Sequence, residues 1–309
     1  MSDTRTRVLF ALFAIPAVVA MAWFGGYAWM LFIAAVQVAA IVEYGRLVRA
    51  KGATPQRGTM IALSLLLLVV FMHERLSADA VLLFGPLAWP LQWQALLWVL
   101  LLGVMLALLV ELFRAADAPL LNIGSTLLGV MYIGLFLATT VGIREIFTVV
   151  EFPVGRVFGT ATLNTAQLAQ LERWGGGTMI AVLAGIWMCD TAAYFGGRAM
   201  GRHKLFPRVS PKKTWEGAIW GAVAAVGSML AARAIALDYL GVVDAVLLGL
   251  MIGVLGQLGD LAESLLKRDA GVKDSSGMLP GHGGVFDRFD SLIFVSPAVF
   301  LYLDFIVFA

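Results

Sequence analysis

Charged residues are scarce in this 309-residue sequence, and cysteine is almost absent. Only 14% of the residues are Asp, Glu, Lys or Arg, whereas a soluble domain carries about 25%. The single cysteine, Cys189, excludes an intrachain disulfide, and its apolar surroundings predict a small buried side chain. No nucleic-acid-binding motif or heptad array is present, so neither nucleic-acid binding nor a coiled coil is expected. No internal repeat is evident, which disfavours an inverted-repeat transporter.

The sequence is instead dominated by apolar residues. They make up 61% of the chain, and the mean hydropathy is +0.89. Apolar runs of about 17–25 residues recur, each long enough to cross ~30 Å of hydrocarbon as a helix. We therefore expect an all-α polytopic membrane protein with about nine transmembrane helices. These lie near 7–24, 27–45, 58–73, 95–112, 121–142, 177–197, 215–236, 242–266 and 290–308.

Two apolar segments need a separate interpretation. Residues 80–94 contain two prolines, which favours an interfacial or re-entrant loop with Trp89 and Trp93 at the level of the lipid headgroups. The run at 7–24 could be a cleaved signal peptide. We favour a helical hairpin formed by this run and the next one, because the next run begins at about residue 27, almost directly after the first ends.

Lysine and arginine predict the topology. Most of the 22 basic residues fall in loops on one side of a nine-span arrangement. Because cytoplasmic loops carry the excess of Lys and Arg, we expect a cytoplasmic N-terminus and an external C-terminus. Residues 264–290 then lie in the cytoplasm, and the stretch 143–176 lies outside. The basic residues that do not follow the bias are Arg75, Arg144, Arg156, Arg173 and Arg233.

The densest charge in the chain, SLLKRDAGVKDSSGMLPGHGGVFDRFD at 264–290, lies between two apolar spans. Charge at a bilayer edge is costly unless it binds something. Asp and Glu hold hard cations such as Mg²⁺, Lys and Arg neutralise phosphate oxygens, and glycine lets backbone N–H groups approach those oxygens. The mixture therefore indicates a site for phosphates carried by a metal ion.

The helix that precedes this segment presents polar residues on one face. Asp260, Glu263, Ser264 and Lys267 are spaced at i, i+3, i+4 and i+7. Asp260 would lie roughly 10 Å inside the cytoplasmic end, where a carboxylate should face a cavity or an ion. A purely structural alternative is an ion pair of Lys267 with Asp260 or Glu263.

The loop that follows carries further candidates. Glycines at 281, 283 and 284 are typical of a backbone cradle for phosphate. Asp287 and Asp290 lie one helical turn apart at the start of the last span, where capping of the helix is the alternative role for Asp290. His282 could donate to a phosphate or merely bond the backbone of its turn.

A third cluster closes the span at 177–197 and opens the next. Asp190 and Tyr194 share a helix face, with Asp190 about 12 Å inside the boundary. Ser210-Pro211 resembles an N-cap followed by proline at the first helical position. Lys212 and Lys213 would then flank a helix N-terminus and bind an anion, unless they are ordinary positive flanks of a span.

At these residues the chain resembles the phosphatidate cytidylyltransferases, also called CDP-diacylglycerol synthases. The segments DTAAYFGGR and SPKKTWEG are also similar to that family, so the resemblance covers about 40% of the chain, from residue 186 onward. The earlier spans match only in being hydrophobic. The signature positions that agree are Ser264, Lys267, Arg268, Lys273, Asp274, Pro280, His282, Gly283, Gly284, Asp287, Arg288 and Asp290.

The resemblance implies that CTP and phosphatidate react to give CDP-diacylglycerol and pyrophosphate. It implies a Mg²⁺ site at Asp260 and Asp287, with Mn²⁺ as a substitute and K⁺ as a possible second cation. The expected catalytic residues are Asp260, Asp287, Lys267, Asp274 and Asp290. The expected substrate-binding residues are Lys212, Lys213, Ser264, Arg268, Lys273, His282, Gly283, Gly284, Arg288 and Asp190.

Location within the chain suggests a division of labour. Lys212 and Lys213 are expected to serve phosphatidate, and Lys267 and Arg268 to serve the CTP phosphates. Chemistry is expected in 176–309, and none can be recognised in 1–175. The expected partners are CTP, phosphatidate and the bilayer, with a homodimer as an option, in a bacterial cytoplasmic membrane with the site facing the cytoplasm.

Three other functions stay open. A CTP-dependent lipid-alcohol kinase would also need a phosphate site at the membrane edge. An ion-coupled transporter would explain buried Asp190 and Asp260 but not the glycine-rich loop. A non-catalytic scaffold would use the charged loop only to recruit partners. The DG…AR…G…D…D pattern of the CDP-alcohol phosphotransferases is absent.

Overall fold

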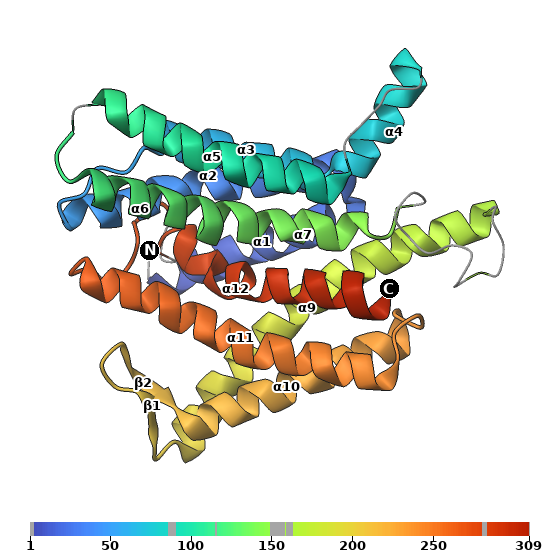
Figure 1. The fold of residues 1–309 in the computed structure, drawn as a ribbon. Coiled ribbons are helices and arrows are strands. Elements are labelled where there is room, and N and C mark those ends of the chain that lie inside the picture. The colour runs from blue at the N-terminus through green and yellow to red at the C-terminus, as the bar shows by residue number, and fades with distance from the viewer. Residues whose placement is uncertain are drawn as a thin grey trace.

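The computed structural model describes residues 3–85, 91–114, 116–148, 158, 163–279 and 283–308, with side chains from residue 12 onward. Long helices lie side by side in one bundle (Figure 1). The helices are α1 (Asp3–Phe24), α2 (Gly26–Ala50), α3 (Arg57–Phe71), α4 (His73–Phe84), α5 (Gln92–Arg114), α6 (Pro119–Gly129), α7 (Phe136–Glu145), α9 (Thr165–Met200), α10 (Trp215–Ile235), α11 (Val242–Asp269) and α12 (Phe286–Tyr302). The π-helical segment η1 (Val130–Leu135) joins α6 to α7, and η2 (Leu303–Val307) extends α12.

The expectation of an all-α polytopic membrane protein is confirmed. Among the described residues, seven helical segments are long and apolar enough to cross a membrane by themselves. α3 and α4 would make an eighth if they form one span, but a bend of 72° separates them. The first expected span, 7–24, lies within α1, whose apolar stretch Leu12–Phe24 has described side chains.

The segment at 80–94 differs from the expectation. α4 continues through Phe84, because His73–Phe84 contains no proline, and it ends where Gly85 adopts a positive φ of 84°. α5 begins at Gln92, so Trp93 is helical, and its ring lies 6.2 Å from that of Phe300. Trp89 lies outside the described residues. The loop interpretation was therefore wrong at both ends of this segment.

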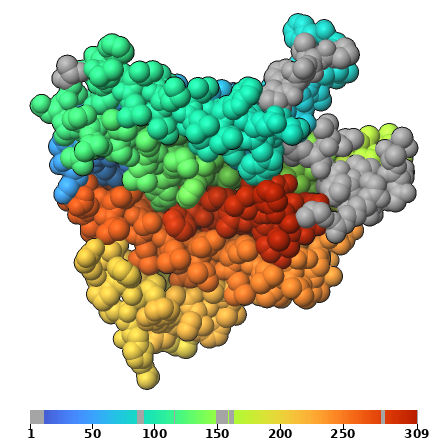
Figure 2. Space-filling view, in the orientation of Figure 1, coloured from blue at the N-terminus to red at the C-terminus, as the bar shows by residue number. Residues whose placement is uncertain are grey.

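A small sheet replaces the helix start expected at Ser210-Pro211. Strands β1 (Lys204–Phe206) and β2 (Ser210–Thr214) pair antiparallel, with Lys204 opposite Thr214. α10 begins only at Trp215, and the Thr214 hydroxyl accepts the N–H of Gly217 as its cap. Lys212 and Lys213 therefore lie on a strand. The hairpin projects at one corner of the molecule, beyond α11 (Figure 2).

Glycines bring the last four long helices close together. A Cβ on Gly217 of α10 would lie 2.6 Å from the carbonyl oxygen of Ala193 in α9. A Cβ on Gly253 of α11 would lie 2.6 Å from the Cα of Ala222 in α10. Helices in a membrane associate through such close backbone contacts, because burial of apolar surface provides no driving force for association in lipid.

The two halves of the chain form one packed bundle. α12 packs against α11 and α7, and α2 contacts α7 and α12. The ends of the chain lie toward opposite ends of the bundle (Figure 1). The hairpin and the α11–α12 loop share the end at which the N-terminus lies. Charged loops that are far apart in the sequence thus meet at one end of the molecule.

Replacing Gly259 with alanine should lower stability. The new Cβ would lie 2.6 Å from the Cβ of Phe294 and 2.8 Å from the carbonyl oxygen of Asp290, so α11 and α12 would have to separate. Overpacking of this kind costs about 1–3 kcal/mol. Gly227→Ala is the matched control, because nothing lies within 4 Å of its Cβ position. Thermal unfolding in detergent, followed by tryptophan fluorescence, should show a lower Tm only for Gly259→Ala; equal Tm values would contradict the proposed close contact.

Candidate active site

Five carboxylates from four parts of the chain surround one cavity of about 210 Å³. They come from α9, α11, the α11–α12 loop and the first turns of α12. Apart from Lys267, Arg288 and Ser291, the residues that line this central cavity are Asp190, Asp260, Asp274, Asp287 and Asp290. The excess of negative charge makes the cavity suited to a cation or to a ligand that brings one.

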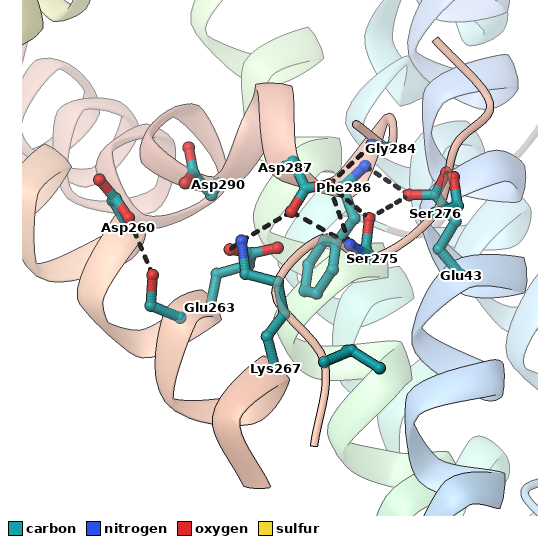
Figure 3. A network of polar contacts seen from close by, with 12 residues as sticks. Glu43, Asp260, Glu263, Lys267, Ser275, Ser276, Gly284, Phe286, Asp287 and Asp290 are labelled. Atoms are coloured by element: carbon teal, nitrogen blue, oxygen red, sulfur yellow. Dashed lines mark hydrogen bonds and ion pairs between the residues drawn. The ribbon is translucent and has the colours of Figure 1, made fainter. Parts of the chain in front are cut away.

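Asp260 is the carboxylate of α11 that faces the cavity. Its side chain is 34% exposed, and its Oδ2 lies 2.7 Å from the Nζ of Lys213 on β2. The Ser264 hydroxyl, one turn later, donates to Asp260 Oδ1 at 3.2 Å. Asp290 of α12 lies beside Asp260 (Figure 3). Gly259 explains why Asp260 and Asp290 lie close together, because the absence of a side chain at Gly259 lets α12 approach α11.

Lys267 is buried between two acids. Its Nζ donates to Asp287 Oδ1 at 2.6 Å and forms an ion pair with Glu263. The Glu263 side chain is 0% exposed and that of Asp287 is 5% exposed. Both structural pairings were considered from the sequence, and the structure contains the one with Glu263. Lys267 therefore neutralises two carboxylates that would otherwise be buried without compensation.

The start of α12 is tied to the preceding loop through Asp287. Its Oδ2 accepts the N–H of Gly284 at 2.7 Å and the Ser275 N–H at 3.0 Å, and the Ser275 hydroxyl lies at 3.0 Å. Gly283 has a φ of +79°, which favours glycine. The Gly284 N–H, expected to cradle a phosphate, is thus bonded to a carboxylate of the protein in this conformation.

Glu43 of α2 reaches the same loop from the other half of the chain. Its carboxylate is fully buried and accepts hydrogen bonds from Ser275, Ser276, Val285 and Phe286 (Figure 3). Sequence reasoning missed this residue. A signal was present, since an ionisable residue inside an apolar span marks a functional site by default.

Two larger cavities adjoin the central one. The first, of about 540 Å³, shares Asp190 and Asp260 with it and is also lined by Arg198, Lys212 and Lys213. We call it the basic cavity.

The second has a volume of about 490 Å³ and is formed by apolar side chains of α1, α2, α9 and α12. Arg288 is the charged residue among its described lining, and it also lines the central cavity. We call this second space the apolar cavity. The acidic centre thus lies between a cavity that carries basic side chains and an apolar cavity.

Not every residue expected at the site lines one of these cavities. Arg268 donates to the carbonyl oxygens of Val209 and Val272 instead. Lys273 is exposed and is not among the lining residues. His282 lies outside the described residues.

The described residues contain no cluster of three or more His, Cys, Asp or Glu close enough to hold a metal ion. Mg²⁺ does not require one, because it commonly binds through one or two carboxylates, water and substrate phosphates. The donor set of the central cavity, with Asp260 open to it, fits such a cation.

Comparison with known proteins identifies relatives over the whole chain. Residues 5–306 match the sequence profile of the cytidylyltransferase family. A protein of Synechocystis is 34% identical over 303 residues, which cover 96% of this chain and 95% of the relative. A Brucella suis protein is 47% identical over 152 residues, 49% of this chain and 55% of the relative. A Bacillus subtilis protein is 41% identical over 137 residues, 44% and 51% respectively. All three are named phosphatidate cytidylyltransferase.

Replacing Lys267 with alanine should strongly destabilise the bundle. It leaves Glu263 and Asp287 buried without their shared cation, and breaking a buried pair costs about 3–5 kcal/mol. Adding Glu263→Gln should restore part of the loss, because one uncompensated charge disappears. Lys51→Ala is the control, since its ion pair with Asp269 is exposed and worth about 1 kcal/mol or less. Denaturant unfolding in mixed micelles measures each value, and a Lys267→Ala loss no larger than that of Lys51→Ala would refute this assignment.

Proposed function

This chain belongs to the cytidylyltransferase family, and we propose that it transfers the cytidylyl group of CTP to phosphatidate, giving CDP-diacylglycerol and pyrophosphate for phospholipid synthesis. The relative that spans nearly the whole chain carries the name of this enzyme. The observation that carries the proposal is the acidic central cavity between a basic cavity and an apolar one. A nucleotide and a lipid can meet there from two different environments.

The reaction needs little covalent chemistry from the protein. A phosphate oxygen of phosphatidate attacks the α-phosphorus of CTP, and the bond to pyrophosphate breaks. The nucleophile is largely ionised at neutral pH, because a phosphate monoester has a second pKa near ~6. No general base is therefore required, and the protein's task is to position two anions in line and neutralise their charge.

We propose that a divalent cation, Mg²⁺ or Mn²⁺, binds at the central cavity with Asp260 and Asp287 as the protein ligands. When bound, it neutralises charge on the phosphates during transfer. Asp260 has the more accessible carboxylate, whereas Asp287 already accepts bonds from Lys267, Ser275 and Gly284. The remaining acids of the cavity provide charge for a second, monovalent cation such as K⁺.

The cavities favour a division of substrates that reverses the expectation from the sequence. Lys212 and Lys213 line the basic cavity, which suits the CTP phosphates. Arg288 lies between the apolar cavity and the acidic centre, which suits a lipid phosphate whose acyl chains occupy apolar space. Lys267 is less suited to CTP, because two carboxylates already neutralise it.

We also propose that the site faces the cytoplasm, in a bacterial inner membrane. CTP is a cytoplasmic metabolite, and the basic loops gather at the end of the bundle that holds the site.

Label transfer tests the function directly. With purified protein, phosphatidate and Mg²⁺ in detergent, label from the α-phosphate of CTP should enter the lipid, and label from the γ-phosphate should not. Excess EDTA should abolish the transfer; Mg²⁺ or Mn²⁺ should restore it, and Ca²⁺ should do so poorly because of its looser geometry. Lipid labelled from the γ-phosphate would indicate a kinase, and unlabelled lipid would exclude both reactions. Full activity in excess chelator would remove the cation from the proposal.

Steady-state kinetics tests the division of substrates. Lys212→Gln should raise the KM for CTP, and Arg288→Gln should raise the KM for phosphatidate. Loss of a charge-assisted phosphate contact costs about 1.5–3 kcal/mol, or roughly 10- to 100-fold in KM. Lys204→Gln, an exposed position on the same hairpin, should change neither constant. Equal effects of the first two variants on both substrates would mean one shared anion site.

A further inference from the structure

The buried carboxylate of Glu43 is bonded to the middle of the loop between α11 and α12 and to the point where that loop enters α12. In the middle of this loop it accepts the Ser275 hydroxyl at 2.8 Å and the Ser276 hydroxyl at 2.5 Å. At the end of the loop it accepts the N–H of Val285 at 3.1 Å and that of Phe286 at 2.8 Å. A single side chain therefore connects Ser275 and Ser276 to the first residues of α12, directly before Asp287.

We propose that Glu43 is a positioning residue, which holds this loop so that Asp287 faces the central cavity. Glu43 is not among the residues that line the cavity, so it acts through its neighbours. This inference rests on the proposed function, because it assigns a role in that reaction to a helix of the N-terminal half.

The contacts require a carboxylate. Ionised Glu has two oxygens and about four acceptor positions, and four donors meet it here. Two of these donors are N–H groups at the start of α12, where a negative charge is favourable because of the helix dipole. A glutamine would turn an NH₂ group toward donors, so two of the four would lose their acceptor.

Ser275 connects Glu43 to Asp287. Its hydroxyl lies within hydrogen-bond distance of Glu43 Oε2 and of Asp287 Oδ2, while its N–H donates to Asp287. Gly284 completes the arrangement, since a Cβ there would collide with the Ser275 hydroxyl and the Glu43 carboxylate. Movement of the Glu43 carboxylate would therefore shift two of the donors that orient Asp287.

Packing of α2 does not explain why Glu43 is charged. Ala40, Ile41, Tyr44 and Leu47 bury the helix against its neighbours. Among the residues that the structure describes, the hydrogen bonds to the Glu43 carboxylate all come from the loop or the start of α12. A buried charge costs several kcal/mol unless its acceptor positions are filled. The hydrogen bonds that offset this cost for Glu43 come from the loop and the start of α12.

The test compares Glu43→Gln with Glu111→Gln. Glu111 is an equally suitable buried carboxylate on α5, which accepts from Gln56, Arg114 and Asn122 and contacts none of the cavities described above. Glu43→Gln should lower kcat about 10- to 100-fold, as loss of supporting residues around a metal ligand does, with smaller changes in both KM values. Glu111→Gln should lower Tm but leave kcat near that of the parent protein.

Hydrogen exchange supplies a readout that does not depend on turnover. Peptides covering 275–279 and 283–286 should exchange faster in Glu43→Gln than in the parent protein, and should not change in Glu111→Gln. If Glu43→Gln does not fold, Ser276→Ala removes one donor and should give the same pattern with smaller changes.

Two failures can be told apart. If the parent protein does not transfer the cytidylyl group, the proposed function is wrong, but the hydrogen-exchange experiment still tests the contacts of Glu43. A parent protein with full activity, together with Glu43→Gln that keeps kcat within twofold and loop exchange unchanged, would overturn the positioning role. A similar loss of Tm in both variants with kcat preserved would also overturn it, because Glu43 would then be merely structural.

Discussion

The carboxylate of Asp287 connects the elements that build the site. It lies in the first turn of α12 and accepts hydrogen bonds from Lys267 of α11 and from Ser275 and Gly284 of the loop. Inside a bundle surrounded by hydrocarbon, each of these charged or polar groups is costly if it is left without a partner. Satisfying Asp287 therefore sets the relative position of two helices and the loop between them.

Close helix packing makes this arrangement geometrically attainable. Gly217, Gly253 and Gly259 let α9, α10, α11 and α12 approach until backbone atoms are nearly in contact. Asp190, Asp260 and Asp290 consequently line one small cavity although they belong to three helices. Lys213, which is paired with Asp260, reduces their mutual repulsion.

The surroundings of the acidic centre explain how a polar and an apolar reactant can meet. Lys212 and Lys213 stand on a hairpin that projects beyond the helices, whereas Arg288 lies at the border of an apolar cavity formed by helices of both halves. In the division of substrates that we propose, the nucleotide phosphates lie near the lysines of the basic cavity and the lipid chains lie in the apolar cavity.

The sequence alone determined the class of fold, and it predicted the acids that line the central cavity. Apolar runs predict helices because backbone groups in hydrocarbon must bond within their own segment. The signature at 264–290 singled out Asp287 and Asp290, and the polar face of the preceding helix singled out Asp260; all three line the central cavity. The sequence did not reveal Glu43, whose partner Ser275 is 232 positions away, nor the β1–β2 hairpin, whose strands depend on pairing with each other rather than on local propensity. Nor did it decide that Lys267 would bridge Glu263 and Asp287. A motif of neighbouring residues can be recognised in the sequence. The partner of a buried charge depends on tertiary packing, because only packing brings distant helices into contact.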